Sequence, residues 1–108
     1  NKVNGVYSYY NYDLGTTLLR NEWNYEGVIM TDWWMKDGSS SDFENVTNQA
    51  YRVRAQVDVF MPGSARVGKL KGKSDGSIIS SLNTKDGITR GELQRSAMNV
   101  LRTCLKII

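Results

Sequence analysis

The chain has 108 residues, of which 40% are hydrophobic and 23% are charged, and its formal net charge is +3. These fractions are ordinary for a globular protein, and no apolar run is long enough to cross a membrane. A single cysteine excludes an internal disulfide. Because the chain has one cysteine and no histidine, the sequence predicts neither a metal site nor a cofactor.

The first strong element is a helix predicted over residues 13–23, with Asp13 as its N-cap and three leucines on one face. A short strand is predicted over residues 27–31, because an apolar run follows a glycine and stops at the carboxylate of Asp32. Groups just past the carboxyl end of a strand carry the chemistry of parallel α/β proteins. Asp32 beside Trp33 therefore suggests a sugar site, and the structural alternative is that Asp32 only caps a turn.

The middle of the chain predicts a second helix and a second strand. Ser41 and Glu44 form a capping box that opens the helix, and one side of this helix carries Phe43, Val46, Ala50 and Val53. The second strand covers residues 57–61 and is stopped by Pro62-Gly63. The basic stretch at 66–73 contains no aromatic residue and is interpreted as a solvated loop, not as a nucleic-acid patch. A short helix is expected near residues 75–83.

The last helix has the clearest signals. Thr89 and Glu92 form a capping box, and Ile88 with Leu93 forms a candidate hydrophobic staple. Apolar residues then recur at helical spacing; they are Leu93, Ala97, Val100, Leu101, Cys104, Leu105 and Ile108. We expect this face to pack on the rest of the chain or on a second copy, with Cys104 as a core thiol.

Residues 18–33, LLRNEWNYEGVIMTDW, resemble the signature of family 3 glycoside hydrolases, which is roughly L-L-R-x-E-W-G-F-x-G, three hydrophobic residues and S-D-W. Residues 1–5 resemble the Y-N-x-x-N-G segment of that family without its tyrosine. Residues 55–63 resemble its segment A-G-x-D, two hydrophobic residues and M-P-G, and residues 88–105 resemble its closing helix. The chain departs from the pattern at Asn24 and Gln56, where the family has glycine, and at Tyr25, Thr31 and Val57.

The resemblance implies an α/β fold, the (β/α)8 barrel. Such a barrel needs about 250 residues, so residues 1–108 are expected to form a single segment of it. We expect about two parallel strands and three to four helices from the C-terminal part of a barrel truncated from a larger protein.

The resemblance also implies a retaining β-glycosidase acting on β-glucosides or related O-glycosides, with Asp32 as nucleophile. Trp33 would bind substrate by stacking on the leaving sugar; the alternative is that Trp33 or Trp34 covers the barrel top. Trp23 and Asp58 are interpreted as core and structural residues. The resemblance also implies that the acid/base carboxyl comes from a following domain, outside this chain. The local glutamates, which are Glu22, Glu26, Glu44 and Glu92, are poor substitutes with structural explanations. The isolated segment is therefore expected to be inactive.

A different class of function stays open. The terminal helix and two strands with open edges could make the chain a non-catalytic interaction module that forms homo-oligomers. The expected partners are a carbohydrate substrate in the parent enzyme and a second copy of the chain, with no nucleic acid and no membrane. The sequence predicts neither the sugar specificity nor the cellular location.

Overall fold

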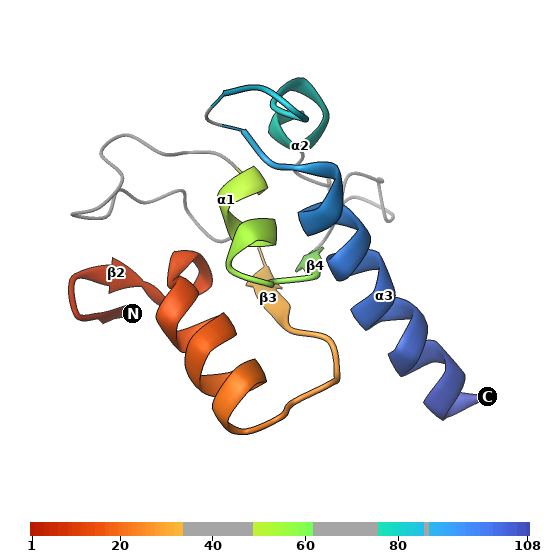
Figure 1. Cartoon of the computed structure of the whole chain (residues 1–108). Coiled ribbons are helices and arrows are strands. Elements are labelled where there is room, and N and C mark those ends of the chain that lie inside the picture. The colour runs from red at the N-terminus through yellow and green to blue at the C-terminus, as the bar shows by residue number, and fades with distance from the viewer. Residues whose placement is uncertain (34–48, 62–75, 86) are drawn as a thin grey trace.

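The computed structural model describes residues 1–33, 49–61, 76–85 and 87–108 (Figure 1). Within these ranges the chain combines helices with two short sheets, in agreement with the expected α/β class. The elements in chain order are β1 (Lys2–Val3), β2 (Val6–Tyr7), the 3-10 helix η1 (Ser8–Tyr10), the π-type helix η2 (Asp13–Glu22), β3 (Met30–Trp33), α1 (Gln49–Arg54), β4 (Val59–Met61), α2 (Ser77–Ser80) and α3 (Arg90–Ile107).

The chain opens with an antiparallel hairpin, in which Lys2 pairs with Tyr7 and Val3 with Val6. Asn4 and Gly5 make its turn with φ angles of 50° and 81°. Two consecutive positive φ angles define the hairpin turn for which Asn-Gly is the favoured sequence. The sequence analysis assigned no secondary structure to this segment, so the hairpin is an additional element.

Helix η2 ends within one residue of the predicted range of 13–23. The Trp23 amide donates to the Leu18 carbonyl at 3.0 Å, five residues back, which is the π-helical spacing. The prediction of Asp13 as N-cap is wrong. Asn11 Oδ1 instead accepts from the Leu14 amide at 3.0 Å, so the side chain that satisfies the first turn lies two residues earlier.

Strands β3 and β4 pair in parallel, which confirms the expectation of two parallel strands. Each strand begins later than predicted, at Met30 and Val59 instead of residues 27 and 57. Met30 pairs with Val59 and Trp33 pairs with Met61. The step from one pair to the next is three residues on β3 and two on β4, so β3 carries one extra residue, a β-bulge.

Two small clusters form the core of the described part of the chain. One contains Val6, Tyr9, Tyr10 and Val57, and the other contains Ala50, Val53 and Ile88. Ala50 and Val53 are thus buried on one side of α1, as predicted. In Figure 1, η2 and α3 lie on opposite sides of the β3–β4 pair, and α1 lies between them.

Several predictions lie outside the described residues. They concern Trp34, the 41/44 capping box, Phe43, Val46, the Pro62-Gly63 stop and the basic stretch at 66–73. The short helix expected near 75–83 is present as α2.

Helix α3 confirms its predicted start, because the Thr89 side chain accepts from the Glu92 amide at 3.2 Å and Glu92 Oε2 accepts from the Thr89 amide at 2.8 Å. Ile88, one half of the predicted staple, is buried. Among the described helices, none is long and apolar enough to cross a membrane.

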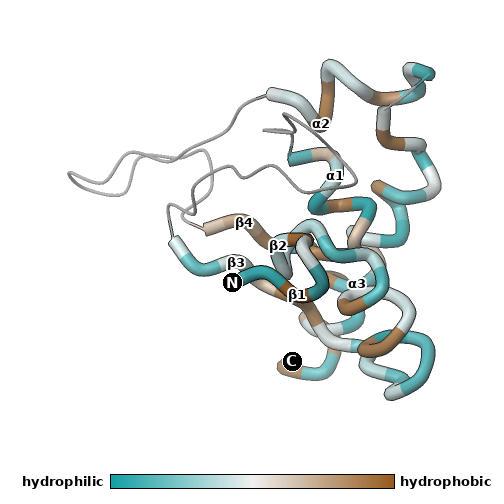
Figure 2. Tube along the Cα trace, turned by 90° about the vertical axis from the view of Figure 1, so that its left-hand side faces the viewer, coloured by the Kyte–Doolittle hydropathy of each residue, from teal (hydrophilic) through white to brown (hydrophobic). Residues whose placement is uncertain are grey.

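The predicted inner face of α3 is wrong. Ser96 and Asn99 are buried, whereas Leu101 is 56% and Leu105 is 74% exposed, and Cys104 is exposed instead of being a core thiol. Figure 2 shows the C-terminal end of this helix in the brown of hydrophobic residues. The physical reason is that the polar side of α3 faces Asp58, with which its buried side chains form hydrogen bonds.

Candidate functional site

Asp32 lies in β3 on the wall of a hollow of about 460 Å³. This volume falls within the range of small-molecule sites. The hollow is lined by Ser8, Tyr9, Leu14, Gly15, Leu18, Leu19, Trp23, Ile29, Met30, Thr31, Asp32 and Val57. The surrounding elements are η1, η2 and β3, so Asp32 shares the hollow with aromatic and aliphatic residues that come from an earlier part of the chain.

The aromatic residues near Asp32 differ from expectation. Trp33 is 44% exposed and follows Asp32 directly, but it is not among the described residues that line the hollow. Trp23, predicted to be core, is 67% exposed and does line it. A tryptophan that the sequence analysis set aside therefore shares the hollow with Asp32.

The backbone at Asp32 is held by Thr31, whose side chain is buried. Thr31 Oγ1 donates to the Asp32 carbonyl at 2.9 Å and accepts from the Met61 amide, also at 2.9 Å. This hydroxyl therefore links β3 to β4 at the bulge. From the sequence, Thr31 is only a departure from the family pattern, where serine is usual.

Asp58 supports the start of β3. Its hydrogen bonds confirm the interpretation of Asp58 as a structural acid. Its Oδ2 accepts from Arg20 Nη2 at 2.7 Å and from the Ile29 amide at 3.1 Å. Its Oδ1 accepts from Ser96 Oγ at 3.0 Å and from Asn99 Nδ2 at 3.1 Å. A fully buried carboxylate with four donors is satisfied in place, so Asp58 joins η2, β3 and α3 around the start of the candidate site.

Arg20 extends this support to the turn before β3. Its Nη1 donates to the carbonyl oxygens of Gly27 at 2.8 Å and Tyr25 at 3.2 Å. The guanidinium group thus fixes both the buried Asp58 and the segment that leads into β3. An arginine is suited to this because its planar fork offers several donors in a fixed geometry.

None of the described glutamates lines the hollow that contains Asp32. Glu92 pairs with Arg54 at 2.8 Å, and Glu26 pairs with Lys106 at 3.3 Å. Burial raises the pKa of the Glu92 carboxyl, but the hydrogen bonds from Arg54 and Thr89 together lower it by more. The pKa of Glu92 therefore lies below its ordinary value. Among the described residues that line the hollow, Asp32 is the one carboxylate.

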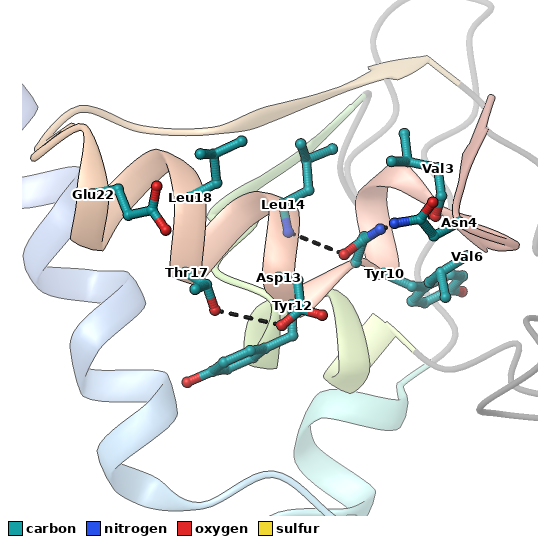
Figure 3. Close-up of a pocket in the computed structure, with 11 residues that line it drawn as sticks. Val3, Asn4, Val6, Tyr10, Tyr12, Asp13, Leu14, Thr17, Leu18 and Glu22 are labelled. Carbon is teal, nitrogen blue, oxygen red and sulfur yellow. Dashed lines mark hydrogen bonds between the residues drawn. The ribbon is translucent and has the colours of Figure 1, made fainter.

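A second hollow, of about 510 Å³, shares Leu14 and Leu18 with the first and contains Asp13 and Glu22 but not Asp32 (Figure 3). Its walls are internally braced: Thr17 donates to Asp13 at 3.4 Å, and Asn11 bridges the hairpin and η2. Within the described ranges, no three His, Cys, Asp or Glu side chains gather closely enough to hold a metal ion.

No family model matches the chain. It is 37% identical over 100 residues to a β-glucosidase from Ruminococcus albus, an alignment that covers 93% of this chain and 10% of that protein. It is 41% identical over 66 residues to a β-glucosidase from Rhizobium radiobacter, covering 61% of this chain and 7% of that protein. The chain thus spans about a tenth of the length of these curated relatives, or less.

Solved structures agree with the sequence relatives. A β-glucosidase from Paenibacillus barengoltzii matches 97% of this chain and 11% of its own, with a TM-score of 0.71 and 37% identity. β-Glucosidase 3B from Thermotoga neapolitana matches 97% of this chain and 13% of its own, with a TM-score of 0.69 and 28% identity. Over almost its whole length, the chain is therefore similar in sequence and fold to one segment of β-glucosidases.

Proposed function

We propose that the chain is the nucleophile-bearing segment of a retaining β-glycosidase of glycoside hydrolase family 3 that hydrolyses β-glucosides or related O-glycosides. The observation that carries the proposal is the position of Asp32, in a strand paired in parallel and on the wall of a hollow. The similarity of the chain to β-glucosidases over 93% of its length supports the substrate class.

In this proposal residues 1–108 form a single segment from the C-terminal part of a (β/α)8 barrel. Two observations support it: β3 and β4 are parallel, and helix α1 lies between them in the chain. A strand, a helix and a parallel strand are the repeating unit of that barrel. The remaining strands would come from the rest of the parent protein.

The proposed chemistry begins with the Asp32 carboxylate, which attacks the anomeric carbon of the substrate. The bond from that carbon to the leaving oxygen breaks, and a second carboxyl group donates its proton to this oxygen. Water, deprotonated by the same second group, then attacks the anomeric carbon and releases Asp32. The hollow has Asp32 as its one carboxylate among the described lining residues. The resemblance to family 3 glycoside hydrolases is the ground for assigning the second group to a part of the parent outside this chain.

Trp33 is proposed to bind the sugar that leaves. Trp33 is 44% exposed and directly follows the proposed nucleophile. An exposed indole offers a large flat apolar face with a polar edge, which suits one face of a pyranose. Trp23, which lines the hollow that contains Asp32, offers a second aromatic surface.

The test is mass spectrometry after exposure to an activated 2-deoxy-2-fluoro glucoside, with the parent protein and the isolated chain treated side by side. The expected result is one added sugar on the peptide that contains Asp32, in the parent alone. Asp32→Asn in the parent is the matched control and should abolish the label. Hydrolysis by the parent with the label on any other residue would contradict the assignment.

A second candidate, a non-catalytic module that forms homo-oligomers, is supported by the apolar side chains that α3 leaves exposed. Leu101 and Leu105 are one helical turn apart and are more than half exposed. Light scattering across a hundredfold range of concentration would test this candidate. A mass that doubles in the chain but not in Leu101→Gln/Leu105→Gln would support it, and a constant monomer mass would exclude it.

A further inference from the structure

The bulge in β3 falls on the residues that precede and include the candidate nucleophile. Because Met30 pairs with Val59 and Trp33 with Met61, the two residues Thr31 and Asp32 lie opposite a single residue of β4. A bulge bends its strand and changes the direction of the side chains beside it, and for this reason bulges are common next to active sites. The direction of Asp32 thus depends on how the bulge is held.

One side chain holds it. A bulge interrupts the backbone ladder, and here the Met61 amide donates to Thr31 Oγ1 at 2.9 Å, where a regular ladder would offer it a carbonyl. The same oxygen donates its proton to the Asp32 carbonyl at 2.9 Å. Thr31 is 6% exposed, so water has little access to replace either bond. The hydroxyl joins the backbone of the nucleophile to the neighbouring strand.

We propose that Thr31 is a positioning residue for Asp32, acting through this two-sided hydrogen bond and not through the volume of its side chain. The inference rests on the proposed function, because it takes Asp32 as the nucleophile. The two hydrogen bonds fix the Asp32 carbonyl and the spacing between β3 and β4. This restricts the orientation of the Asp32 side chain, so that its carboxylate is held in position for attack.

Two substitutions separate the hydroxyl from the shape of the side chain. Thr31→Val keeps the branched shape and removes the hydroxyl, while Thr31→Ser keeps the hydroxyl and removes the methyl group. Both are to be made in the full-length polypeptide that carries this segment. The rate of labelling of Asp32 by the activated 2-deoxy-2-fluoro glucoside, the kcat and KM for an aryl β-glucoside, and the melting temperature are then compared.

For Thr31→Val we expect labelling and kcat to fall at least tenfold while KM changes less than threefold, because the nucleophile is misdirected but the sugar still binds. For Thr31→Ser we expect labelling within threefold of the unsubstituted protein. A melting temperature that falls equally in both variants, with labelling lost only in Thr31→Val, would assign the effect to positioning. Labelling by a folded Thr31→Val at the unsubstituted rate would overturn the inference.

Thr31→Cys is the second variant, for use if Thr31→Val does not fold. A thiol occupies the same place but is a weaker donor and acceptor, so labelling should be at least threefold slower than in Thr31→Ser. Equal rates in Thr31→Cys and Thr31→Ser would overturn the role of the hydroxyl while leaving Asp32 as nucleophile. A label on a residue other than Asp32 in the unsubstituted protein would overturn the proposed function itself.

Discussion

Arg20 Nη2 lies 2.7 Å from Asp58 Oδ2, and the two side chains are only 7% and 0% exposed. The pair connects η2 to the start of β4, 38 residues further along the chain. Its carboxylate has further donors in Ser96 and Asn99. Buried charges are tolerated when they are paired and hydrogen-bonded in this way, and removal of one partner leaves the other uncompensated.

Asp58→Asn is therefore expected to lower the free energy of unfolding by about 3–5 kcal/mol, since it leaves the Arg20 charge buried and unpaired. Urea unfolding followed by tryptophan fluorescence measures this. The matched control is Glu26→Gln, which removes the exposed partner of Lys106 and should change stability by less than about 1 kcal/mol. Equal effects of the two substitutions would contradict the importance of burial.

Gln56 has a φ of 66°, in the left-handed region that residues other than glycine rarely adopt. Gln56→Gly and Gln56→Ala both remove the side-chain bonds to Thr16 and Asn99, but only glycine relieves the backbone. Gln56→Gly should therefore be about 1 kcal/mol more stable than Gln56→Ala. Comparing the urea midpoints of the two variants isolates the free-energy cost of a left-handed backbone at position 56. A more stable alanine variant would mean that the backbone at this position is not left-handed.

Glu92 makes the stability of the chain depend on pH. Because its pKa is lowered in the folded state, its contribution is fully present above the unfolded pKa of about 4.3 and is lost as the pH falls through the folded pKa. Glu92→Gln removes the charge that pairs with Arg54 but can keep the capping box. It should thus cost no more than about 1 kcal/mol at pH 7, and the difference from the unsubstituted chain should shrink toward pH 3. Unfolding curves at both pH values check this. A gap that widens on acidification would have the wrong sign.

The 108-residue chain alone is expected not to hydrolyse aryl β-glucosides. Retaining hydrolysis needs two carboxyl groups about 5–5.5 Å apart, whereas Asp32 is the one carboxylate among the described residues that line its hollow. Release of nitrophenol from a nitrophenyl β-glucoside should match that of the Asp32→Asn chain. Turnover above the Asp32→Asn level would show that a second acid within the chain reaches the site.

Elements with strong local signals were predictable from the sequence. The capping box of Thr89 and Glu92 marks the start of α3 correctly because both partners lie within one helical turn. The packing of α3 was not predictable from its apolar pattern. The polar face of α3 packs inward because Ser96 and Asn99 donate hydrogen bonds to the buried Asp58. These two residues lie 38 and 41 positions after Asp58 in the sequence.

The backbone conformation explains why the family pattern has glycine at positions 24 and 56. Asn24 and Gln56 both have positive φ angles, 54° and 66°, so the sites that resemble glycine positions keep a conformation that glycine adopts most easily. Asparagine tolerates this region better than most residues, and Gln56 is held there by its hydrogen bonds to Thr16 and Asn99. The sequence alone indicated that Asn24 and Gln56 depart from the family pattern, but it did not indicate their backbone conformation.

At the candidate site, Asp32 could be singled out from the resemblance, but its support could not. The bond from the Met61 amide to Thr31 depends on the register between two strands that lie 30 residues apart. The exposure of Trp23 likewise depends on how η2 ends. Both are properties of packing between distant segments, about which local spacing carries no information.

From the hydrogen bonds of Asp58 we expect an order of events during synthesis. A chain leaves the ribosome from its N-terminus, so Arg20 is free to pair with Oδ2 as soon as Asp58 has emerged. Oδ1 has to wait for Ser96 and Asn99, made 38 and 41 residues later. Until then one oxygen of this carboxylate must keep its water, and the nascent chain cannot close over it. The last step in sealing this interior thus belongs to α3.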